Sequence, residues 1–318
     1  MMPRNFTLFR FPVDLPVFEP RELHNGASFS IEEPLALEGL RECALAPVGP
    51  LELESRGFVP PMGSACEDLA IVLDGAFWMA VGFQQRMLPP AVVAEALGRK
   101  LAEIERTEGR RLGGRMRKQI RDELVQEMLP KAFVRTRRVD VLLDLERGLC
   151  AVDTTSRKLA EAVVSEIRRA IGSFPALPLN AEVAPRAVLT GWIAGDPLPA
   201  GLALGEECLL KEADDHGAAV RCTRQDLQSD EIERHLEAGK QVTRLGLTLD
   251  DRVGFVLGED LVLRKWHLLD AAALEEADPD NIQEELHARF ALTLGTLREV
   301  FDTLEPALRI SQIHQMEG

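Results

Sequence analysis

The stretch GRMRKQIRDELVQEMLPKAFVRTRR, which runs from Gly114 to Arg138, decides how this chain folds. Its first half has an apolar residue at every fourth position, at Met116, Ile120, Leu124 and Met128. This spacing predicts an amphipathic helix, because side chains four residues apart lie on one helix face. Pro130 ends the helical pattern, since a proline inside a helix removes a backbone hydrogen bond.

After Pro130 the pattern changes to a period of two, which predicts a β-strand. One face of this strand begins with Lys131, Phe133, Arg135 and Arg137. The same face continues with apolar side chains at Val139, Val141 and Leu143. We therefore expect one strand that leaves a buried sheet and ends in a cationic rim.

Another helix is predicted just before residue 114. Pro89 and Pro90 open it, and Gly109 and the pair Gly113-Gly114 separate it from the next helix. Two helices joined by a glycine-rich turn form an antiparallel hairpin, so we expect a projecting basic helical hairpin inserted at about 89–130. Its cations lie opposite the apolar stripe at Arg115 and Lys118, and on its flank at Arg117 and Arg121.

The rest of the N-terminal half contains three further local signals. Asp74-Gly75 separates two apolar runs and is a two-residue β-hairpin signal. The segment 56–64 contains two successive prolines and predicts a loop. A helix with N-capping residues at its start and a glycine at its end is predicted over 157–171.

The C-terminal half begins with frequent prolines over 173–205, which predict a linker or an irregular crossover. A meander of strands is predicted over 240–266, and a final amphipathic helix from about 279 to 304. Hairpins and helices thus occur in separate runs, which is typical of the α+β class. We expect an N-terminal α+β domain over 1–180 and a C-terminal α+β domain over 181–318.

Charge is distributed unevenly along the chain. The formal net charge is −15, yet residues 99–138 contain 13 Lys and Arg against 6 Asp and Glu. A cationic segment in an acidic protein directs an anionic ligand to that segment, and a phosphate backbone is such a ligand. The alternative is a solvated helical hairpin whose arginines pair with glutamates on the same helices.

The composition indicates a soluble cytoplasmic protein that does not bind membranes. No apolar run approaches the roughly 18 residues of a membrane span, and the start lacks the order of a secretory signal. The five cysteines are scattered, odd in number and without a CxxC pair. Such cysteine usage is typical of a reducing compartment.

No catalytic signature is recognisable. The sequence lacks a Walker A loop, the GxGxxG, GxSxG and HExxH motifs, and any acidic residue two positions before a lysine. We therefore expect a protein that is not an enzyme and has no catalytic residue, metal or cofactor. Two alternatives stay open: a metal-dependent nuclease or phosphodiesterase that uses Asp140, Asp144 and Asp153, and a regulator whose acidic surface mimics DNA and binds a basic protein.

Five segments, in their order and spacing, together resemble one family. They are GFVPPMG (Gly57–Gly63), LPKAF (Leu129–Phe133), GLCAVDTTSRKLAEAVVSEIRRAIGSFPALPL (Gly148–Leu179), LTGW (Leu189–Trp192) and RQDLQSDEIERHLEAGKQVTRLGL (Arg224–Leu247). Over nearly its whole length the chain is similar to the RdgC family, the recombination-associated DNA-binding proteins of proteobacteria. It departs from the family pattern at Lys131, where arginine is usual.

The resemblance implies a non-enzymatic protein that binds double-stranded and single-stranded DNA with little sequence preference. It also implies a ring-shaped homodimer around DNA, restraint of the RecA recombinase and association with the nucleoid. At matching positions it implies roles for Phe133, Arg224 and Gln225. Together with the cationic segment, the candidate DNA-binding residues are Arg115, Arg117, Lys118, Arg121, Lys131, Phe133, Arg135, Arg137, Arg224 and Gln225.

Overall fold

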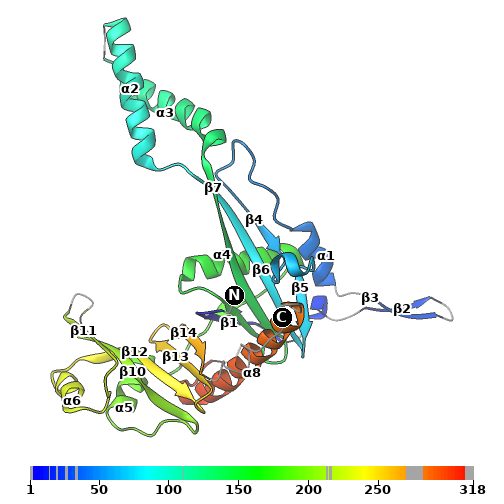
Figure 1. Cartoon of the computed structure of the whole chain (residues 1–318), viewed down its shortest axis with the longest axis vertical. Helices are drawn as coiled ribbons and strands as arrows, with labels where there is room; N and C mark the ends of the chain where they lie inside the picture. The colour runs from blue at the N-terminus through cyan, green and yellow to red at the C-terminus, as the bar shows by residue number, and fades with distance from the viewer. Residues whose placement is uncertain are drawn as a thin grey trace.

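The computed structural model describes residues 3–13, 15–18, 21–25, 28–32, 35–109, 111–212, 214, 217–269 and 282–311. Within these residues the chain is α+β with antiparallel sheets, which confirms the predicted fold class. The molecule is elongated: helices α2 (Pro90–Glu108) and α3 (Gly114–Met128) lie at one end and a five-stranded sheet lies at the other (Figure 1). A seven-stranded sheet connects the two ends.

The seven-stranded sheet is built around two 12-residue strands, β6 (Ala76–Met87) and β7 (Phe133–Asp144). They pair over their whole length, from Ala76 opposite Asp144 to Met87 opposite Phe133. β7 is buried from Val139 onward and exposed before it, so the β6–β7 ribbon extends out of the body and carries α2 and α3 (Figure 1). The sheet order is β4 (Glu54–Val59), β6, β7, β8 (Leu149–Val152), β1 (Thr7–Arg10) and β9 (Leu177–Pro178), with β5 (Ala70–Leu73) paired to β6.

The predicted hairpin turn at Asp74-Gly75 is confirmed. It joins β5 to β6, and its φ angles are 48° at Asp74 and 67° at Gly75. Positive φ at both central residues is what a type I′ turn requires, and glycine adopts it without steric cost.

The predicted loop over 56–64 is wrong in its first part. β4 continues to Val59 and pairs with β6, with Gly57 opposite Gly82. Pro60 ends this strand, since it has no N–H to donate to a neighbouring strand. The partner of β4 comes later in the chain, so the strand depends on pairing that the segment itself does not reveal.

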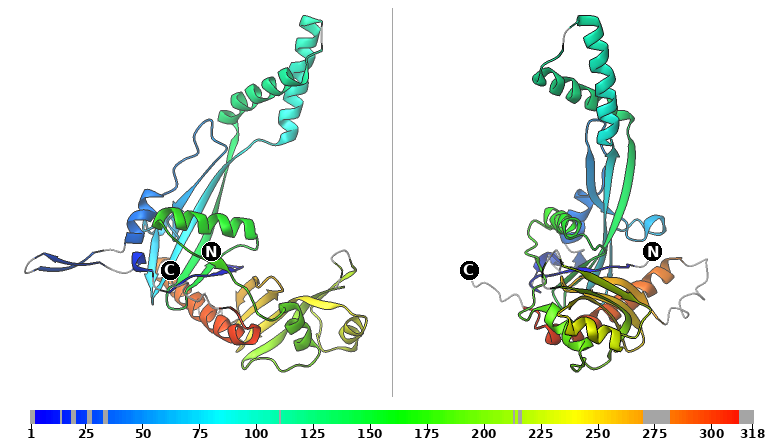
Figure 2. Two further views of the ribbon diagram at one scale, coloured as in Figure 1. Left: turned by 180° about the vertical axis from the view of Figure 1, so that it is seen from behind. Right: turned by 90° about the vertical axis from the view of Figure 1, so that its left-hand side faces the viewer.

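One face of this sheet is covered by helices α1 (Leu35–Glu42) and α4 (Arg157–Ile171), and α4 crosses the long strands (Figure 2). α4 begins where predicted, because Ser156 Oγ accepts a hydrogen bond from Leu159 N at 3.4 Å. Its buried side chains Val163 and Ile167 pack in one cluster with Val141 of β7. The predicted helix over 157–171 is therefore confirmed.

The other face is covered by the C-terminal helix α8 (Ile282–Leu308). Trp78 of β6 packs on Phe290 of α8 with ring centroids 5.6 Å apart, and Leu142 of β7 belongs to the same apolar cluster. The helix predicted from about 279 is thus present. Residues 279–281 lie outside the described part of the chain.

The five-stranded sheet contains the predicted meander. Its order is β11 (Ala219–Thr223), β10 (Leu202–Lys211), β12 (Gln241–Leu249), β13 (Val253–Gly258) and β14 (Leu263–Leu268). Phe255 and Trp266 of this sheet lie in the apolar cluster that contains Trp78, and Phe6 N donates to Leu263 O at 2.7 Å. One core therefore includes residues from before and after 180, and the division into domains at that point stays a prediction.

The predicted linker over 173–205 contains a helix, α5 (Pro185–Ile193). Pro185 stands in its first turn, where the missing N–H costs nothing. Leu189 and Trp192 are buried, and Val242 N of β12 donates to Thr190 Oγ1 at 2.9 Å. The expectation of irregular chain is wrong over 185–193, because Pro185 begins a helix instead of preventing one.

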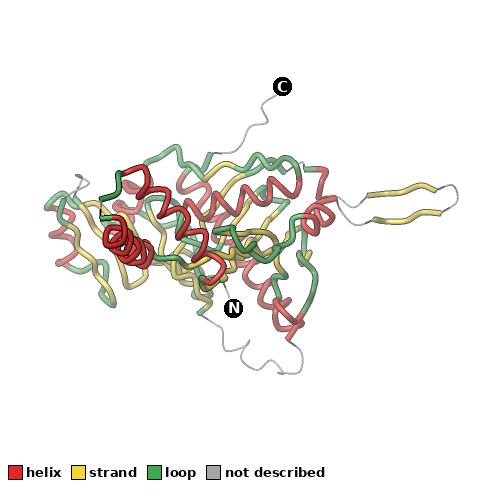
Figure 3. The backbone as a smooth tube through the Cα atoms, turned by 90° about the horizontal axis from the view of Figure 1, so that it is seen from above, coloured by secondary structure: helices red, strands yellow, loops and turns green. Residues whose placement is uncertain are grey.

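The remaining elements are short. β2 and β3 pair as a separate two-stranded ribbon that extends sideways from the rest of the chain (Figure 3). No helix in the part of the chain that the structure describes has the length and apolar character to cross a bilayer. The bounds of these elements are η1 (Pro16–Phe18), β2 (Arg21–Asn25), β3 (Ser28–Glu32), η2 (Gly63–Ala65), η3 (Leu129–Lys131) and α6 (Asp230–Glu237).

Candidate nucleic-acid interface

Helix α3 presents a row of exposed cations. Arg115, Lys118 and Arg121 are exposed, and within the described residues none of them forms an ion pair. Arg117 differs from them, because its Nε donates to Leu112 O at 3.1 Å and its Nη2 lies 3.7 Å from Glu105 on α2. Arg117 therefore links the two helices, while the other three cations are available to an anion.

The contact between α2 and α3 buries few side chains. Val93 is the buried residue of α2, Ile120 that of α3, and Leu129 follows in η3. Most side chains of both helices are exposed to solvent. The two helices thus present a largely solvent-exposed surface at the end of the β6–β7 ribbon, which includes the apolar side chains of Val92 and Met116.

The exposed end of β7 carries three further candidates. Phe133 has 87% of its surface exposed, and Arg135 and Arg137 form no ion pair among the residues described. These residues share one face of the strand, as predicted from the two-residue period. Lys131 lies outside this strand, contrary to the prediction. It belongs to η3, whose first turn contains Pro130, a position that proline favours, and its Nζ lies 3.9 Å from Glu127.

Arg224 and Gln225 follow β11 at the opposite end of the molecule. Arg224 has a φ of 56°, lines an open groove of about 750 Å³ with Thr223 and Lys265, and has no ion-pair partner in the described chain. Gln225 is engaged, since its Nε2 donates to Glu231 Oε2 at 2.9 Å. Within one chain β11 and α3 lie far apart (Figure 1), so the structure does not bring these two groups of candidates together.

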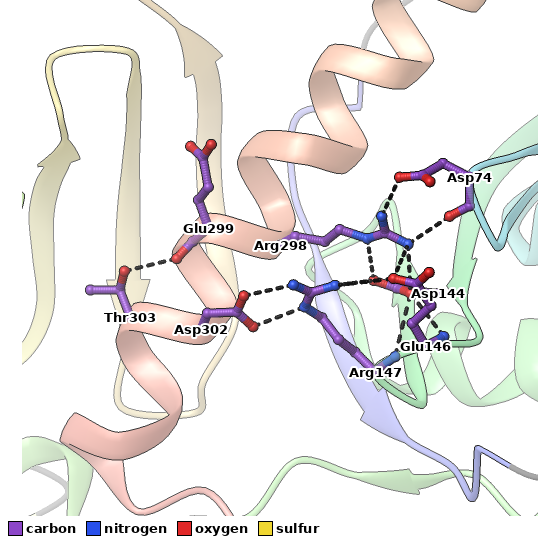
Figure 4. Close-up of polar contacts among 8 residues, drawn as sticks. All are labelled: Asp74, Asp144, Glu146, Arg147, Arg298, Glu299, Asp302 and Thr303. Carbon is purple, nitrogen blue, oxygen red and sulfur yellow. Dashed lines mark hydrogen bonds and ion pairs between the residues drawn. The ribbon is translucent and has the colours of Figure 1, made fainter.

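Asp144 is held in an ion-pair network with α8 (Figure 4). Arg298 Nε donates to Asp144 Oδ2 at 2.7 Å and its Nη1 to Asp74 Oδ2 at 2.6 Å. Arg147 Nη1 lies 3.6 Å from Asp144 Oδ2, and the same guanidinium forms two hydrogen bonds with Asp302. Hydrogen bonding to Asp144 raises the pKa of Arg298. The carboxylate of Asp144 is therefore bound by arginine side chains, and these contacts join the sheet to α8.

Asp140 and Asp153 are likewise engaged by protein groups. Trp78 Nε1 donates to Asp140 Oδ1 at 3.1 Å, and Asp153 Oδ1 accepts from Asn5 N at 2.9 Å. Burial raises the pKa of both carboxyl groups. Across the described residues no three His, Cys, Asp or Glu side chains are placed to hold a metal ion. The three aspartates of the nuclease alternative thus do not gather into a metal site there.

Two cations that the sequence did not single out lie beside Arg135 and Arg137. Arg56 of β4 and Lys158 of α4 line, with these two arginines, Gln85 and Ser156, a groove of about 400 Å³ that we term the α4 groove. Arg56 belongs to the segment predicted as a loop, and Lys158 to the helix predicted over 157–171. They come from separate elements, so only the topology brings them together.

Comparisons with known proteins identify the family. The model of a family described as "Putative exonuclease, RdgC" matches residues 4–311. "Recombination-associated protein RdgC" of Xanthomonas campestris pv. campestris (strain B100) is 53% identical over 312 residues, which are 97% of this chain and 98% of that protein. The protein of the same name from Stenotrophomonas maltophilia (strain R551-3) is 48% identical over the same shares of both chains. By sequence and by length, this chain belongs to the RdgC family.

Proposed function

We propose that this chain is a DNA-binding protein of homologous recombination that recognises the phosphate backbone without sequence preference. The observation that supports this most is the set of exposed cations on α3 that have no ion-pair partner in the described residues, in a chain of net charge −15. Arg and Lys contacts to phosphates release counterions and supply affinity for any sequence. The acidic remainder of the surface repels DNA and leaves the cationic surfaces as the place of contact.

The separation of α3 from Arg224 favours a closed dimer. Closed two-fold symmetry is the common arrangement of homo-oligomers, and it places two copies of each surface around one axis. A ring of two chains would let one duplex contact α3 and Arg224 of both copies. DNA that the dimer occupies in this way is withheld from RecA. We expect the protein to restrain recombination by this occupation. Such binding would also keep it on the nucleoid.

Salt-dependent binding to a random-sequence duplex tests this function. The affinity is expected to be similar for unrelated sequences, and log K to fall linearly with log salt with a slope of about −0.9 for each phosphate neutralised. The duplex is expected to stay intact when excess magnesium is present. Strand cleavage would instead support the metal-dependent nuclease, and absence of binding at low salt would support the regulator that binds a basic protein.

Replacing Arg224 by glutamate tests the ring. Reversing one charge at a phosphate contact is expected to weaken duplex binding roughly tenfold at about 0.1 M salt. Light scattering is expected to give twice the chain mass of 35.2 kDa for both proteins, with equal melting temperatures. A folded, dimeric Arg224→Glu variant with unchanged affinity would place DNA on the α3 end alone, and a monomeric wild type would exclude the ring.

A further inference from the structure

We propose that Arg86, at the outer end of β6, positions the cations of α3 for DNA by tying the end of α3 to the segment between α1 and β4. The inference deepens the proposed function and rests on it. Arg86 acts on DNA binding through α3 and not through a phosphate contact of its own. We term its side-chain contacts the Arg86 clamp.

One side of the guanidinium binds the end of the helical segment that contains α3. Arg86 Nη1 donates to Leu129 O at 3.0 Å and, more weakly, to the carbonyl oxygens of Pro130 and Ala132 at 3.4 Å. Leu129 and Pro130 belong to η3, which follows α3 directly. Carbonyl groups at the end of a helix have few backbone donors, since no further turn follows them, and a cation there lies at the negative end of the helix dipole. Arg86 therefore caps the end of α3 from outside the helix.

The other side of the guanidinium binds the segment between α1 and β4, which runs beside the long strands toward α2 and α3 (Figure 1). Arg86 Nε donates to Gly49 O at 3.2 Å and its Nη2 to Val48 O at 3.4 Å. Backbone groups fix the same segment to β6, since Arg86 N donates to Leu53 O at 2.8 Å and Val48 N to Gln84 Oε1 at 3.0 Å. The segment is thus a fixed point to which Arg86 ties the end of α3.

The pair of helices α2 and α3 has few other contacts that fix its direction. The pair is joined to the sheet through the ends of β6 and β7, and its buried side chains are those of Val93 and Ile120. A helix of 15 residues with so little buried surface is marginally stable by itself. The direction in which α3 presents its cations therefore depends on the contacts at its end, where Arg86 lies.

The bonding of Arg86 argues against a phosphate contact of its own. The residue is half-buried, and all three nitrogens of its guanidinium donate to carbonyl oxygens. A phosphate bound at this guanidinium would have to replace some of these bonds. Loss of DNA affinity on replacing Arg86 can arise from the position of α3 or from lost charge, and the salt dependence of binding separates the two causes.

The first test is a titration of random-sequence duplex with the full-length protein at several salt concentrations. Arg86→Ala is expected to weaken binding roughly tenfold, as it would if α3 kept its binding direction in about one free molecule in ten. The slope of log K against log salt is expected to stay at the wild-type value, because the bound complex neutralises the same phosphates. A lost phosphate contact would instead reduce the slope by about 0.9.

Arg157→Ala is the matched control, because it removes the same charge from an exposed ion pair. Arg157 Nε lies 3.2 Å from Glu161 Oε1 on α4, and both side chains are exposed. The variant leaves the Arg86 clamp intact, so it is expected to change duplex affinity less than about twofold. Arg86→Lys keeps the charge but loses the planar fork that reaches both segments, so it is expected to weaken binding as Arg86→Ala does.

Hydrogen exchange in the absence of DNA tests the clamp itself. In Arg86→Ala and in Arg86→Lys the amides of α3 and of residues 48–53 are expected to exchange faster than in the wild type, and those of β12 at the same rate. Unchanged exchange of α3, unchanged affinity, a reduced salt slope, or wild-type affinity in Arg86→Lys would each overturn the inference while the proposed function stands. A wild type that does not bind duplex would overturn the proposed function, and exchange would still show whether Arg86 holds α3.

Discussion

Charge reversal of Arg115, Lys118 and Arg121 on α3 is expected to lower the affinity for duplex DNA by two to three orders of magnitude at about 0.1 M salt. Each phosphate that a cation neutralises contributes about 0.9 to the salt slope, so the triple change to glutamate is expected to reduce the slope by about 3 for each α3 that contacts DNA. The three side chains are exposed and have no ion-pair partner in the described chain, so their loss leaves the fold intact. Titration of a random-sequence duplex at several salt concentrations measures both quantities.

A control variant reverses two cations of α2 in the same helical pair, and its effect is compared per charge reversed. Arg99 lies 4.0 Å from Glu95 and Lys100 lies 4.0 Å from Glu103, so part of their charge is already compensated. Arg99→Glu with Lys100→Glu is therefore expected to affect binding much less than the α3 variant. If the α3 variant kept wild-type affinity and slope while folded, the duplex would not bind along α3.

The second large effect concerns stability. Arg298→Ala is expected to lower the free energy of unfolding by about 3–5 kcal/mol, because it leaves a buried carboxylate without its main partner. The side chain of Asp144 is 4% exposed and that of Arg298 12%. Arg147 remains near Asp144 but is shared with Asp302, so it does not replace the lost hydrogen bonds. Denaturant unfolding followed by circular dichroism measures the loss.

Arg252 provides the control on the same helix. It pairs with Glu299 of α8, but these side chains are 48% and 45% exposed. An exposed ion pair contributes about 0–1 kcal/mol, since solvent screens it. Arg252→Ala is therefore expected to cost less than 1 kcal/mol. Equal losses in the two variants would show that burial of Asp144 is not the source of the effect.

The helices were predicted best where the chain carries its own boundary signals. α2 begins at Pro90 and ends before Gly109, and α4 follows Ser156 and ends before Gly172. Prolines at helix starts, glycines with positive φ at helix ends and capping hydroxyls act within a few residues, so they are visible in sequence. The strand that follows Pro130 was predicted from its alternation for the same reason.

The errors arose where distant segments decide the structure. β4 exists because it pairs with β6, and α5 packs on β12, although the prolines near both suggested irregular chain. Local sequence signals also reveal only part of the candidate nucleic-acid interface. The cations of α3 were evident from local charge, whereas the α4 groove needs Arg56 and Lys158 from two other elements. Local composition shows charge, but pairing and packing decide which charges become neighbours.

The position of α8 against β6 and β7 has a consequence for how the chain is made. A ribosome adds roughly 5–20 residues each second, so β7 leaves it about ten to thirty seconds before α8 is complete. During that interval Trp78 and Leu142 lie on a sheet face that has no cover, since their partner Phe290 has not been synthesised. We therefore expect nascent chains to need chaperones until α8 has been synthesised. Chains that stop before Ile282 keep this face bare and are expected to aggregate or be degraded.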